Sequence, residues 1–529
     1  MIRLSAVSLS LAQQLARAAG NISQRQHPHS AFVVYRRRGT APSTPSRAFY
    51  RGQEFFAPLQ PSCAGYTRLY SKFSSRLDGL DGPTVWQEFS PLAAEFGAVN
   101  LGQCVIMNYF NTAPLIQIIL FFHNLRNFRG FPDWNPPAFA TEAFMSVLRG
   151  DGDGYNEVNQ YCRPEAYLPL AKELAEEYST RWRREIDPIT DVAVTTGCTG
   201  AMFCAFQGLL NPGDEVILME PAFDIYSSQI IMAGGIPVYV PLRPTRGDDG
   251  AYSSSASECF KLDPAELAAA ITPRTRVVVV NTPHNPTGKV FSRSELASIA
   301  EVVRANPGVL VISDEVYEHI IFDQENSPHI SIATLDGMWG RTLTLSSSGK
   351  TFSATGWKVG WAVGPPELVR PVSASQQWVS FSAPTVNQAA VALCLKKARE
   401  PYETFDTYYD HLAAEYGRKR GLLVDAMGAA GIRPIVPEGG FFIMGDTSDI
   451  KIPSSCLEEP PTAASPRPMP RDWAMSRWMT KEAGVTTIPP SAFFSKPNVH
   501  LADDFLRFAF CKQDGTLVEA KRRFEKYFK

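Results

Sequence analysis

A lysine in a segment of small and hydroxyl-bearing residues has the clearest chemical potential in this chain. Lys350 follows three serines and a glycine, and Lys358 lies eight positions further on. A lysine amine in such surroundings can form a Schiff base, and hydroxyl groups beside a second cation suit a phosphate. Taken alone, the segment also fits an ordinary polar loop, so its meaning depends on the residues that accompany it.

Polar residues follow three short apolar runs that precede this lysine. The runs, residues 215–219, 276–280 and 309–313, are rich in valine, isoleucine and leucine. Such runs predict strands of a parallel sheet that is buried on both faces. Ligands bind at the carboxyl ends of the strands in such a sheet. We therefore expect the residues that follow the runs to converge, among them Glu220, Phe223, Asn285, Asp314 and Tyr317.

Two further segments carry groups that attract anions or interrupt an apolar pattern. Residues 197–201 form a glycine-containing turn that opens a predicted helix, and the N-terminal N–H groups of a helix suit an anion. Arg507 alternates with aromatic residues in 505–510, as it would in a strand. An arginine in that position is usually solvated.

The segment around Lys350 resembles the lysine signature of the class I/II pyridoxal-phosphate (PLP) aminotransferases. Its run Lys-Thr-Phe-Ser-Ala-Thr-Gly-Trp-Lys-Val-Gly-Trp is similar to the kynurenine–oxoglutarate aminotransferase and cysteine-S-conjugate β-lyase (glutamine transaminase K-like) branch. The resemblance extends from about Trp86 to the C-terminus, with one interruption. It implies the α/β fold of the fold-type-I PLP transferases, with a large domain on a mostly parallel sheet flanked by helices and a smaller α+β C-terminal domain.

The resemblance implies how the chain holds pyridoxal 5'-phosphate. Lys350 would bind the cofactor covalently and later carry a proton, and Asp314 would keep the pyridine nitrogen protonated. An isolated aspartate after a strand would more often cap a helix. The remaining cofactor contacts implied by the resemblance are Gly197, Cys198, Thr199, Phe223, Asn285, Tyr317, Ser347, Lys358 and, from a neighbouring subunit, Tyr161.

The resemblance also implies the substrate contacts. Arg507 would grip the α-carboxylate of the substrate with its two-pronged guanidinium, a task for which lysine is a poor substitute. Asn285 and Gly130 would contact the substrate, and Trp86 and Phe381 would line its side-chain pocket. Such a pocket suits kynurenine-like or sulfur-containing amino acids. No metal is expected, and the peptide bonds before Pro221 and Pro286 are expected to be cis.

The chain departs from the family pattern at two places in the site. Cys198 and Thr199 stand where the family more often has a glycine and an aromatic residue or lysine. Ser382 stands beside Phe381, where a histidine is sometimes found. The side-chain contacts to the phosphate and the substrate preference are therefore left open.

A segment of 26 residues, 104–129, separates Asn-Leu-Gly-Gln from Gly-Phe-Pro-Asp, which are contiguous in the family pattern. It carries no acidic residue, and its run 106–125 approaches the length of a membrane span. Asparagine, proline, glutamine and histidine within the run weaken that interpretation. We interpret the segment as translated intron, with a surface loop or a membrane anchor as alternatives.

The charge of the chain is unevenly distributed. Residues 1–77 carry 11 Lys/Arg and one acid, whereas the rest carries 40 basic and 52 acidic groups. An acidic body speaks against nucleic-acid binding, and we expect no membrane partner. The Arg- and Ser-rich leader indicates a mitochondrial transit peptide cleaved near Ser71, although a disordered tail is the alternative. The protein is thus expected in the mitochondrial matrix and possibly also in the cytoplasm.

We predict that the chain has four parts and that it forms a homodimer with shared active sites. We assign residues 1–70 to a disordered transit peptide, 71–137 to an N-terminal arm with the insert, 138–392 to the large PLP-binding domain and 393–529 to the small domain. The nine cysteines form no CxxC pair, so reduced thiols are expected. The Tyr161 role implies the homodimer.

The predicted function is PLP-dependent transamination of L-kynurenine, or a similar aromatic or sulfur amino acid, with a 2-oxo acid such as 2-oxoglutarate. One alternative is β-elimination from cysteine S-conjugates, which uses the same carbanion. Another is a non-catalytic PLP-fold protein, either a transcription regulator or a protein inactivated by its insert. A regulator needs a DNA-binding module, and the basic leader has no helix-turn-helix pattern.

Overall fold

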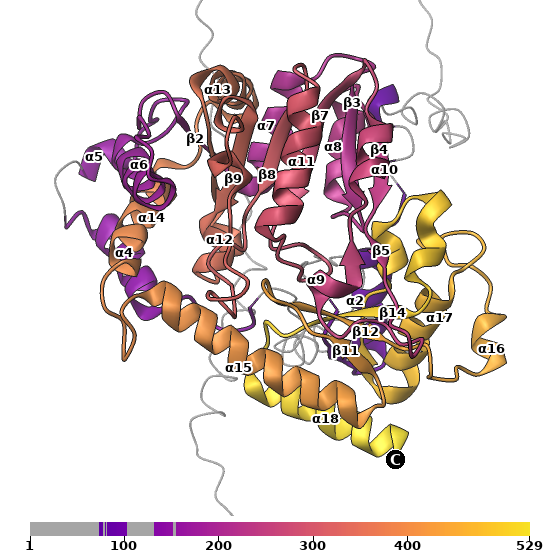
Figure 1. The fold of residues 1–529 in the computed structure, drawn as a ribbon. Helices are drawn as coiled ribbons and strands as arrows, with labels where there is room; N and C mark the ends of the chain where they lie inside the picture. The colour runs from indigo at the N-terminus through magenta and orange to yellow at the C-terminus, as the bar shows by residue number, and fades with distance from the viewer. Residues whose placement is uncertain (1–73, 78–79, 81, 103–131, 152–154) are drawn as a thin grey trace, which may run out of the picture. The chain divides into compact units, whose positions relative to one another are not determined.

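The computed structural model describes residues 74–529, except 78–79, 81, 103–131 and 152–154 (Figure 1). The chain divides into two units, Met1–Tyr70 and Ser71–Lys529, and every described residue belongs to the second. The predicted transit peptide, the insert 104–129 and Gly130 lie outside the described residues. Their assignments, and the four-part division of the chain, remain predictions.

A seven-stranded sheet forms the centre of the second unit. Five of its strands run in a parallel block, and β10 runs antiparallel to both of its neighbours. The three predicted apolar runs become β3, β7 and β8, as expected. In sheet order the strands are β2 (Val192–Thr196), β10 (Val359–Val363), β9 (Thr342–Ser347), β8 (Leu310–Asp314), β7 (Thr275–Asn281), β3 (Glu215–Glu220) and β4 (Ile236–Pro241).

Helices cover both faces of this sheet, which explains the continuous apolar strands. Alternate β7 residues pack on opposite sides: Val277 and Val279 join one cluster, and Val278 and Val280 join the other. The first face is covered by α7 (Gly197–Leu209), α8 (Ile225–Met232) and α13 (Pro366–Ser380), and the second by α10 (Pro264–Ala270) and α11 (Arg293–Ala305) (Figure 1).

A second, smaller sheet lies in the C-terminal part of the chain. It is antiparallel, in the order β11 (Arg433–Ile435), β12 (Phe442–Asp446) and β14 (Phe505–Ala509). The early strand β1 (Val99–Asn100) pairs in parallel with the late strand β13 (Val485–Thr486), so an early and a late segment of this unit lie side by side. The other main helices are α2 (Val85–Glu95), α4 (Ala138–Arg149), α6 (Leu168–Trp182), α14 (Thr385–Ala398), α15 (Tyr408–Ala429), α17 (Arg471–Trp478) and α18 (Asp514–Phe528).

Short elements connect these parts. Residues 451–470 contain a one-turn helix, α16 (Ser454–Leu457). No helix among the described residues is both long and apolar enough to cross a membrane. Further short elements are α5 (Tyr155–Val158), α9 (Ala256–Cys259), α12 (Ser348–Thr351), β5 (Arg243–Pro244) and β6 (Phe260–Lys261).

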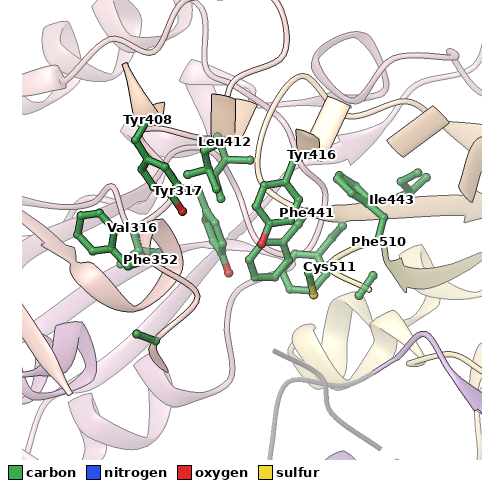
Figure 2. Close-up of a cluster of buried hydrophobic side chains, with 14 of the residues drawn as sticks. Val316, Tyr317, Phe352, Tyr408, Leu412, Tyr416, Phe441, Ile443, Phe510 and Cys511 are labelled. Atoms are coloured by element: carbon green, nitrogen blue, oxygen red, sulfur yellow. The ribbon is translucent and has the colours of Figure 1, made fainter. Parts of the chain in front are cut away.

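An aromatic cluster joins the large sheet to α15 and the small sheet (Figure 2). The ring of Tyr317 meets that of Phe441 edge-on, with centroids 5.0 Å apart. Tyr408 donates a 2.9 Å hydrogen bond to the carbonyl oxygen of Thr351, the last residue of α12. Close packing of this kind leaves little room for side chains to shift. The cluster therefore fixes the segments that carry Tyr317 and Lys350.

Candidate active site

A cavity of about 480 Å³ opens where the strands of the large sheet end. It extends from the N-terminus of α7 to Arg507 on the small sheet, so both parts of the unit contribute to it. This is the edge at which a parallel sheet is expected to bind ligands. The predicted residues that line it are Trp86, Gly197, Cys198, Thr199, Phe223, Asn285, Asp314, Tyr317, Ser347, Lys350, Lys358 and Arg507.

Lys350 reaches the cavity from α12, a single helical turn that follows β9 directly. Gly349 is required here because an added Cβ would lie 3.0 Å from the Cα atom of Thr355. The Nζ atom of Lys350 lies 5.8 Å from the ring centre of Tyr317 and 5.2 Å from that of Phe441. The lysine amine thus lies beside two aromatic rings, and Lys350 lines the cavity.

Asp314, at the end of β8, is held by several donors. Tyr226 donates to its Oδ2 atom at 2.5 Å, and the backbone N–H of Val316 donates to Oδ1 at 3.3 Å. The thiol of Cys198 lies 3.7 Å from Oδ1. Burial raises the pKa of Asp314, while these hydrogen bonds and the charge of Lys350 act in the opposite direction. A buried carboxylate held in this way suits a cationic partner in the cavity.

Two positive groups meet at the start of α7. Gly197 has φ +76°, and an added Cβ there would lie 3.2 Å from the Nζ atom of Lys358. Lys358 itself lies in the left-handed region of the backbone, with φ +54°. An ammonium group beside a helix N-terminus is unfavourable unless an anion lies between them. The arrangement therefore predicts an anion at Gly197–Thr199, close to Ser347.

Arg507 closes the other end of the cavity. Contrary to the usual behaviour of an arginine in such a strand, it is only 1% exposed. Its Nη1 donates to Asn285 Oδ1 at 3.1 Å, and its Nη2 donates to the carbonyl oxygen of Gly102 at 2.7 Å. Trp86, Phe442 and Phe493 surround the guanidinium, with ring centres 5.3, 4.3 and 4.9 Å from its carbon. A buried cation among rings suits a planar anion such as a carboxylate.

Comparison with known proteins identifies the family to which this geometry belongs. A family model of class I and II aminotransferases matches residues 137–523. The chain belongs to the class I and II aminotransferases. It is 41% identical over 442 residues to a kynurenine–oxoglutarate transaminase of Dictyostelium discoideum, covering 83% of this chain and 93% of that protein.

Other relatives and solved structures agree with this assignment. Kynurenine–oxoglutarate transaminase 1 of Homo sapiens is 39% identical, with 85% of this chain and 97% of that protein covered. Bna3p of Saccharomyces cerevisiae has a TM-score of 0.73 and 32% identity, covering 86% of this chain and 99% of that structure. The methionine aminotransferase YbdL of Escherichia coli has a TM-score of 0.69 and 29% identity, with shares of 86% and 99%.

This aminotransferase is PLP-dependent, like its family, and the residues of the cavity fit that cofactor. The positive groups at Gly197 and Lys358 suit the phosphate, and Asp314 suits a protonated pyridine nitrogen. Lys350 supplies the amine for covalent attachment. The fit rests on the observed convergence of an anion site, a buried carboxylate and a lysine within one cavity.

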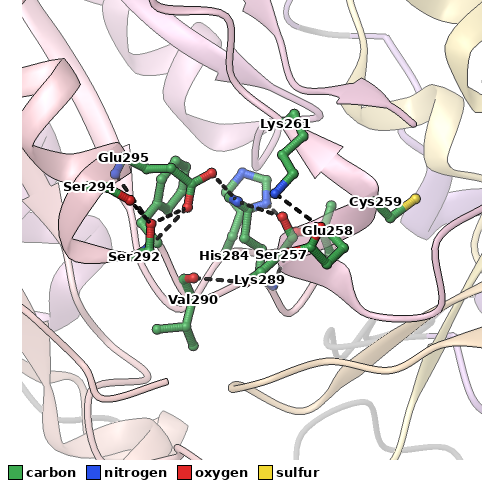
Figure 3. A network of polar contacts seen from close by, with 12 residues as sticks. Ser257, Glu258, Cys259, Lys261, His284, Lys289, Val290, Ser292, Ser294 and Glu295 are labelled. Carbon is green, nitrogen blue, oxygen red and sulfur yellow. Dashed lines mark hydrogen bonds and ion pairs between the residues drawn. The ribbon is translucent and has the colours of Figure 1, made fainter. Parts of the chain in front are cut away.

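A network of polar contacts holds the loop that carries Asn285 (Figure 3). The side chain of Lys289 is fully buried, and its Nζ atom lies 2.5 Å from Glu295 Oε1. His284 Nδ1 lies 2.8 Å from Thr287 Oγ1. Burial, assisted by the charge of Lys289, lowers the pKa of His284 to about 3. The loop is therefore held by a neutral histidine and a buried ion pair.

The peptide bonds preceding Pro221 and Pro286 are cis, as predicted, and so is the bond between Thr282 and Pro283. Asn281 links the two loops of the site, because its Nδ2 donates to the carbonyl oxygen of Asp314 at 2.9 Å and its Oδ1 accepts from the backbone N–H of Asn285 at 2.8 Å. The sequence prediction missed Asn281, although it ends β7 directly before the predicted loop.

Tyr226 was also missed. It lies three residues after Phe223, and this spacing could have placed both residues on the cavity side of one helical turn. A second buried network lies behind the site: Ser346 Oγ donates to Glu318 Oε1 at 2.6 Å, and Arg181 Nη1 donates to Glu318 Oε2 at 2.7 Å. These bonds tie the segment after β8 to β9, which leads to Lys350.

Two predicted residues lie away from the cavity lining. Tyr161 is 82% exposed and Phe381 is 45% exposed, and their ring centres are 5.0 Å apart. Within one chain, Phe381 therefore does not line the side-chain pocket as predicted, because its ring packs on Tyr161 at the surface. Large exposed aromatic rings of this kind are typical of a surface that meets another protein.

Proposed function

We propose that this aminotransferase transfers the amino group of L-kynurenine, or of a similar aromatic or sulfur-containing amino acid, to a 2-oxo acid such as 2-oxoglutarate. The observation that carries the proposal is the placement of Arg507. Its buried guanidinium lies under Trp86 and beside Asn285 in the cavity that contains Lys350. The names of relatives that share 39–41% of its residues support this donor and acceptor.

Each residue has a distinct task in this reaction. Arg507 would bind the α-carboxylate, so that the bond to be broken at the substrate α-carbon faces Lys350. The Lys350 amine would remove the proton from that carbon and deliver it to the C4′ position of the cofactor. Asp314 would hold the proton on the pyridine nitrogen. The cofactor, when bound, supplies an electron-withdrawing ring that stabilises the negative charge developing at the α-carbon.

Transamination and β-elimination begin with the same proton removal, so a pair of assays is needed. The first measures conversion of kynurenine that depends on 2-oxoglutarate, and the second measures pyruvate release from a cysteine S-conjugate. We expect turnover in the first assay and its loss in Lys350→Ala. Pyruvate release without any 2-oxoglutarate-dependent turnover of kynurenine would instead identify a β-lyase. Inactivity toward both would contradict the proposed substrates.

We further propose that the protein is a homodimer in which Tyr161 completes the phosphate site of the partner subunit. The exposed aromatic residues Tyr161, Trp378 and Phe381 support a surface that a second copy covers. Sedimentation should give twice the mass of the chain. Tyr161→Phe should weaken PLP binding in the dimer, whereas Trp339→Phe, on another surface, should not. A monomer that binds PLP with full affinity would contradict this proposal.

We also propose that residues 1–70 direct the protein to the mitochondrial matrix, with a possible second location in the cytoplasm. The excess of arginine and serine over acidic residues in this segment supports import. Residues 1–77 fused to a fluorescent protein should enter mitochondria, and the mature protein should begin near Ser71. A fusion that stays outside mitochondria would contradict the assignment.

A further inference from the structure

Two carboxylates line the described part of the cavity, and only one of them has a role in holding the cofactor. Asp314 is assigned to the ring nitrogen, whereas Asp224, directly after Phe223, has no assigned task although it also lines the cavity. Asp224 takes the N-cap position of α8. Its Oδ2 atom instead accepts a 2.9 Å hydrogen bond from Trp86 Nε1. A half-buried carboxylate in an active site needs a reason to be there.

The bond to Trp86 places Asp224 next to the space for the substrate side chain. Arg507, which would hold the α-carboxylate, lies 5.3 Å from the ring centre of Trp86. The indole therefore separates the guanidinium on its face from the carboxylate at its N–H edge. A substrate bound at Arg507 with its side chain along Trp86 would direct the end of that side chain toward Asp224.

The hydrogen-bonding capacity of Asp224 exceeds what Trp86 uses. A carboxylate offers about four acceptor positions on its two oxygens. Trp86 supplies one donor, and the backbone N–H groups of Ile225 and of Asp224 itself supply two more. Burial raises the pKa of Asp224, while these three donors and the charge of Arg507 act in the other direction. A substrate that brings a further N–H donor would fill the remaining acceptor position, and one without it would leave that position empty.

We propose that Asp224 is a specificity-determining residue that accepts a hydrogen bond from an amino group on the side chain of the amino donor. The inference deepens the proposed function, on which it rests, because it names the chemical feature that the pocket selects: an aromatic ring that carries an amine. A site built to bind a polar substrate group rejects the analogue that lacks it far more strongly than an apolar pocket does.

The sharpest test uses two donors that differ only in the ring amine, kynurenine and 3-benzoylalanine. In the parent enzyme, kcat/KM should favour kynurenine by about 10-fold or more, as expected for a hydrogen bond to a charged group. Asp224→Leu should bring the two kcat/KM values close together. Asp224→Asn keeps an acceptor, so it should retain more of the preference for kynurenine than Asp224→Leu does. The same ratio of kcat/KM for kynurenine and 3-benzoylalanine in the parent and in Asp224→Leu would overturn the proposal.

Two further variants separate recognition from support of Trp86. Trp86→Phe removes the indole N–H but keeps a ring and leaves Asp224 in place, so the preference for the ring amine should persist. If Asp224 serves only to position Trp86, Trp86→Phe and Asp224→Leu should each lower kcat/KM for the two donors by the same factor. That result would contradict the proposal. Asp263→Asn, at the exposed N-cap of α10, is the matched control and should leave the ratio unchanged.

A binding measurement separates this inference from the proposed reaction. The acids 3-(2-aminobenzoyl)propanoate and 3-benzoylpropanoate lack the α-amine and cannot react, yet they carry the same carboxylate and side chains. Their dissociation constants for the PLP-loaded enzyme should differ about 10-fold, and Asp224→Leu should abolish the difference. If kynurenine is not a substrate, this ratio still tests Asp224. Equal binding of the two acids by the parent would refute its role.

Discussion

Tyr226 donates a 2.5 Å hydrogen bond to Asp314, and the two residues come from segments 88 positions apart in the chain. The tyrosine belongs to α8, which begins after Phe223, and the aspartate ends β8. One face of the sheet thus supplies both the carboxylate that we assign to the pyridine nitrogen and the hydroxyl that orients this carboxylate. The bond fixes one carboxylate oxygen and leaves the group aimed into the cavity.

Replacing Asp314 with alanine should impair catalysis far more than cofactor binding. Lys350 and the positive groups at Gly197 and Lys358 would still hold PLP, but the pyridine nitrogen would lose its ionic partner. We expect kcat to fall about 10³-fold or more, as for removal of a dominant electrostatic contact. Steady-state kinetics and a PLP titration measure the two effects. Turnover within a few-fold of the parent would show that the nitrogen has another partner.

Removing the side-chain amine in Lys350→Ala should abolish both covalent attachment of PLP and transamination. Within the described cavity no other lysine approaches the same position, since Lys358 lies against Gly197. Borohydride reduction followed by peptide mass spectrometry should mark Lys350 in the parent and no lysine in the variant. A reducible lysine adduct that persists in Lys350→Ala would refute the assignment.

Arg507→Lys should raise KM steeply, because a point charge replaces a two-pronged contact. Lysine also cannot reproduce both bonds that the guanidinium makes to Asn285 and Gly102. A loss of about 2–4 kcal/mol in substrate binding is expected for a buried, charge-assisted pair. The measurement is KM for a monocarboxylic donor and a dicarboxylic one. If only the dicarboxylic substrate is affected, Arg507 contacts the side chain instead.

The stability of the protein should fall with decreasing pH because of His284. Its pKa drops from 6.5 in the unfolded chain to about 3 in the fold, mainly through burial. Between these values the unfolded chain binds the extra proton, so unfolding becomes easier by up to about 1.4 kcal/mol per pH unit. Denaturant midpoints at pH 7 and pH 5 should differ less in His284→Gln. An identical difference in the variant and the parent would contradict this assignment.

Deletion of residues 104–129 should improve solubility and activity if this segment is translated intron. The chain enters the segment just after Gly102, whose carbonyl oxygen accepts from Arg507. It returns near Asp133, whose Oδ1 accepts from the backbone N–H of Gln513 at 2.5 Å. Both flanks are therefore anchored, the first to Arg507 and the second to the start of α18. A segment with this much Ile, Leu and Phe is costly to solvate.

Transcript sequencing provides the direct test of that interpretation. Some transcripts should join the codons of Gln103 and Gly130, and protein made from them should be the more active form. The parent chain and the variant that lacks residues 104–129 are compared by their PLP content and their rate of kynurenine turnover. Retention of the segment in every transcript, with loss of folding on its deletion, would identify it as a genuine part of the enzyme.

Three strands of the large sheet and many of the residues that line the cavity could be predicted from local sequence patterns. The strands β3, β7 and β8 appear as runs of apolar residues because both faces of the sheet are covered, and polar residues follow wherever a strand ends in the cavity. Lys350, Asp314 and Arg507 could be assigned because the chemistry of the family requires these residue types within recognisable local patterns.

The partners of these residues depended on the folded chain. The bonds from Tyr226 to Asp314 and from Trp86 to Asp224 join segments 88 and 138 positions apart, and neither has a local signature. The burial of Arg507 likewise follows from three rings brought from α2, β12 and the segment before β14. Local patterns record strand ends and helix starts, but contacts between distant segments arise only when the two sheets and α2 pack around one cavity.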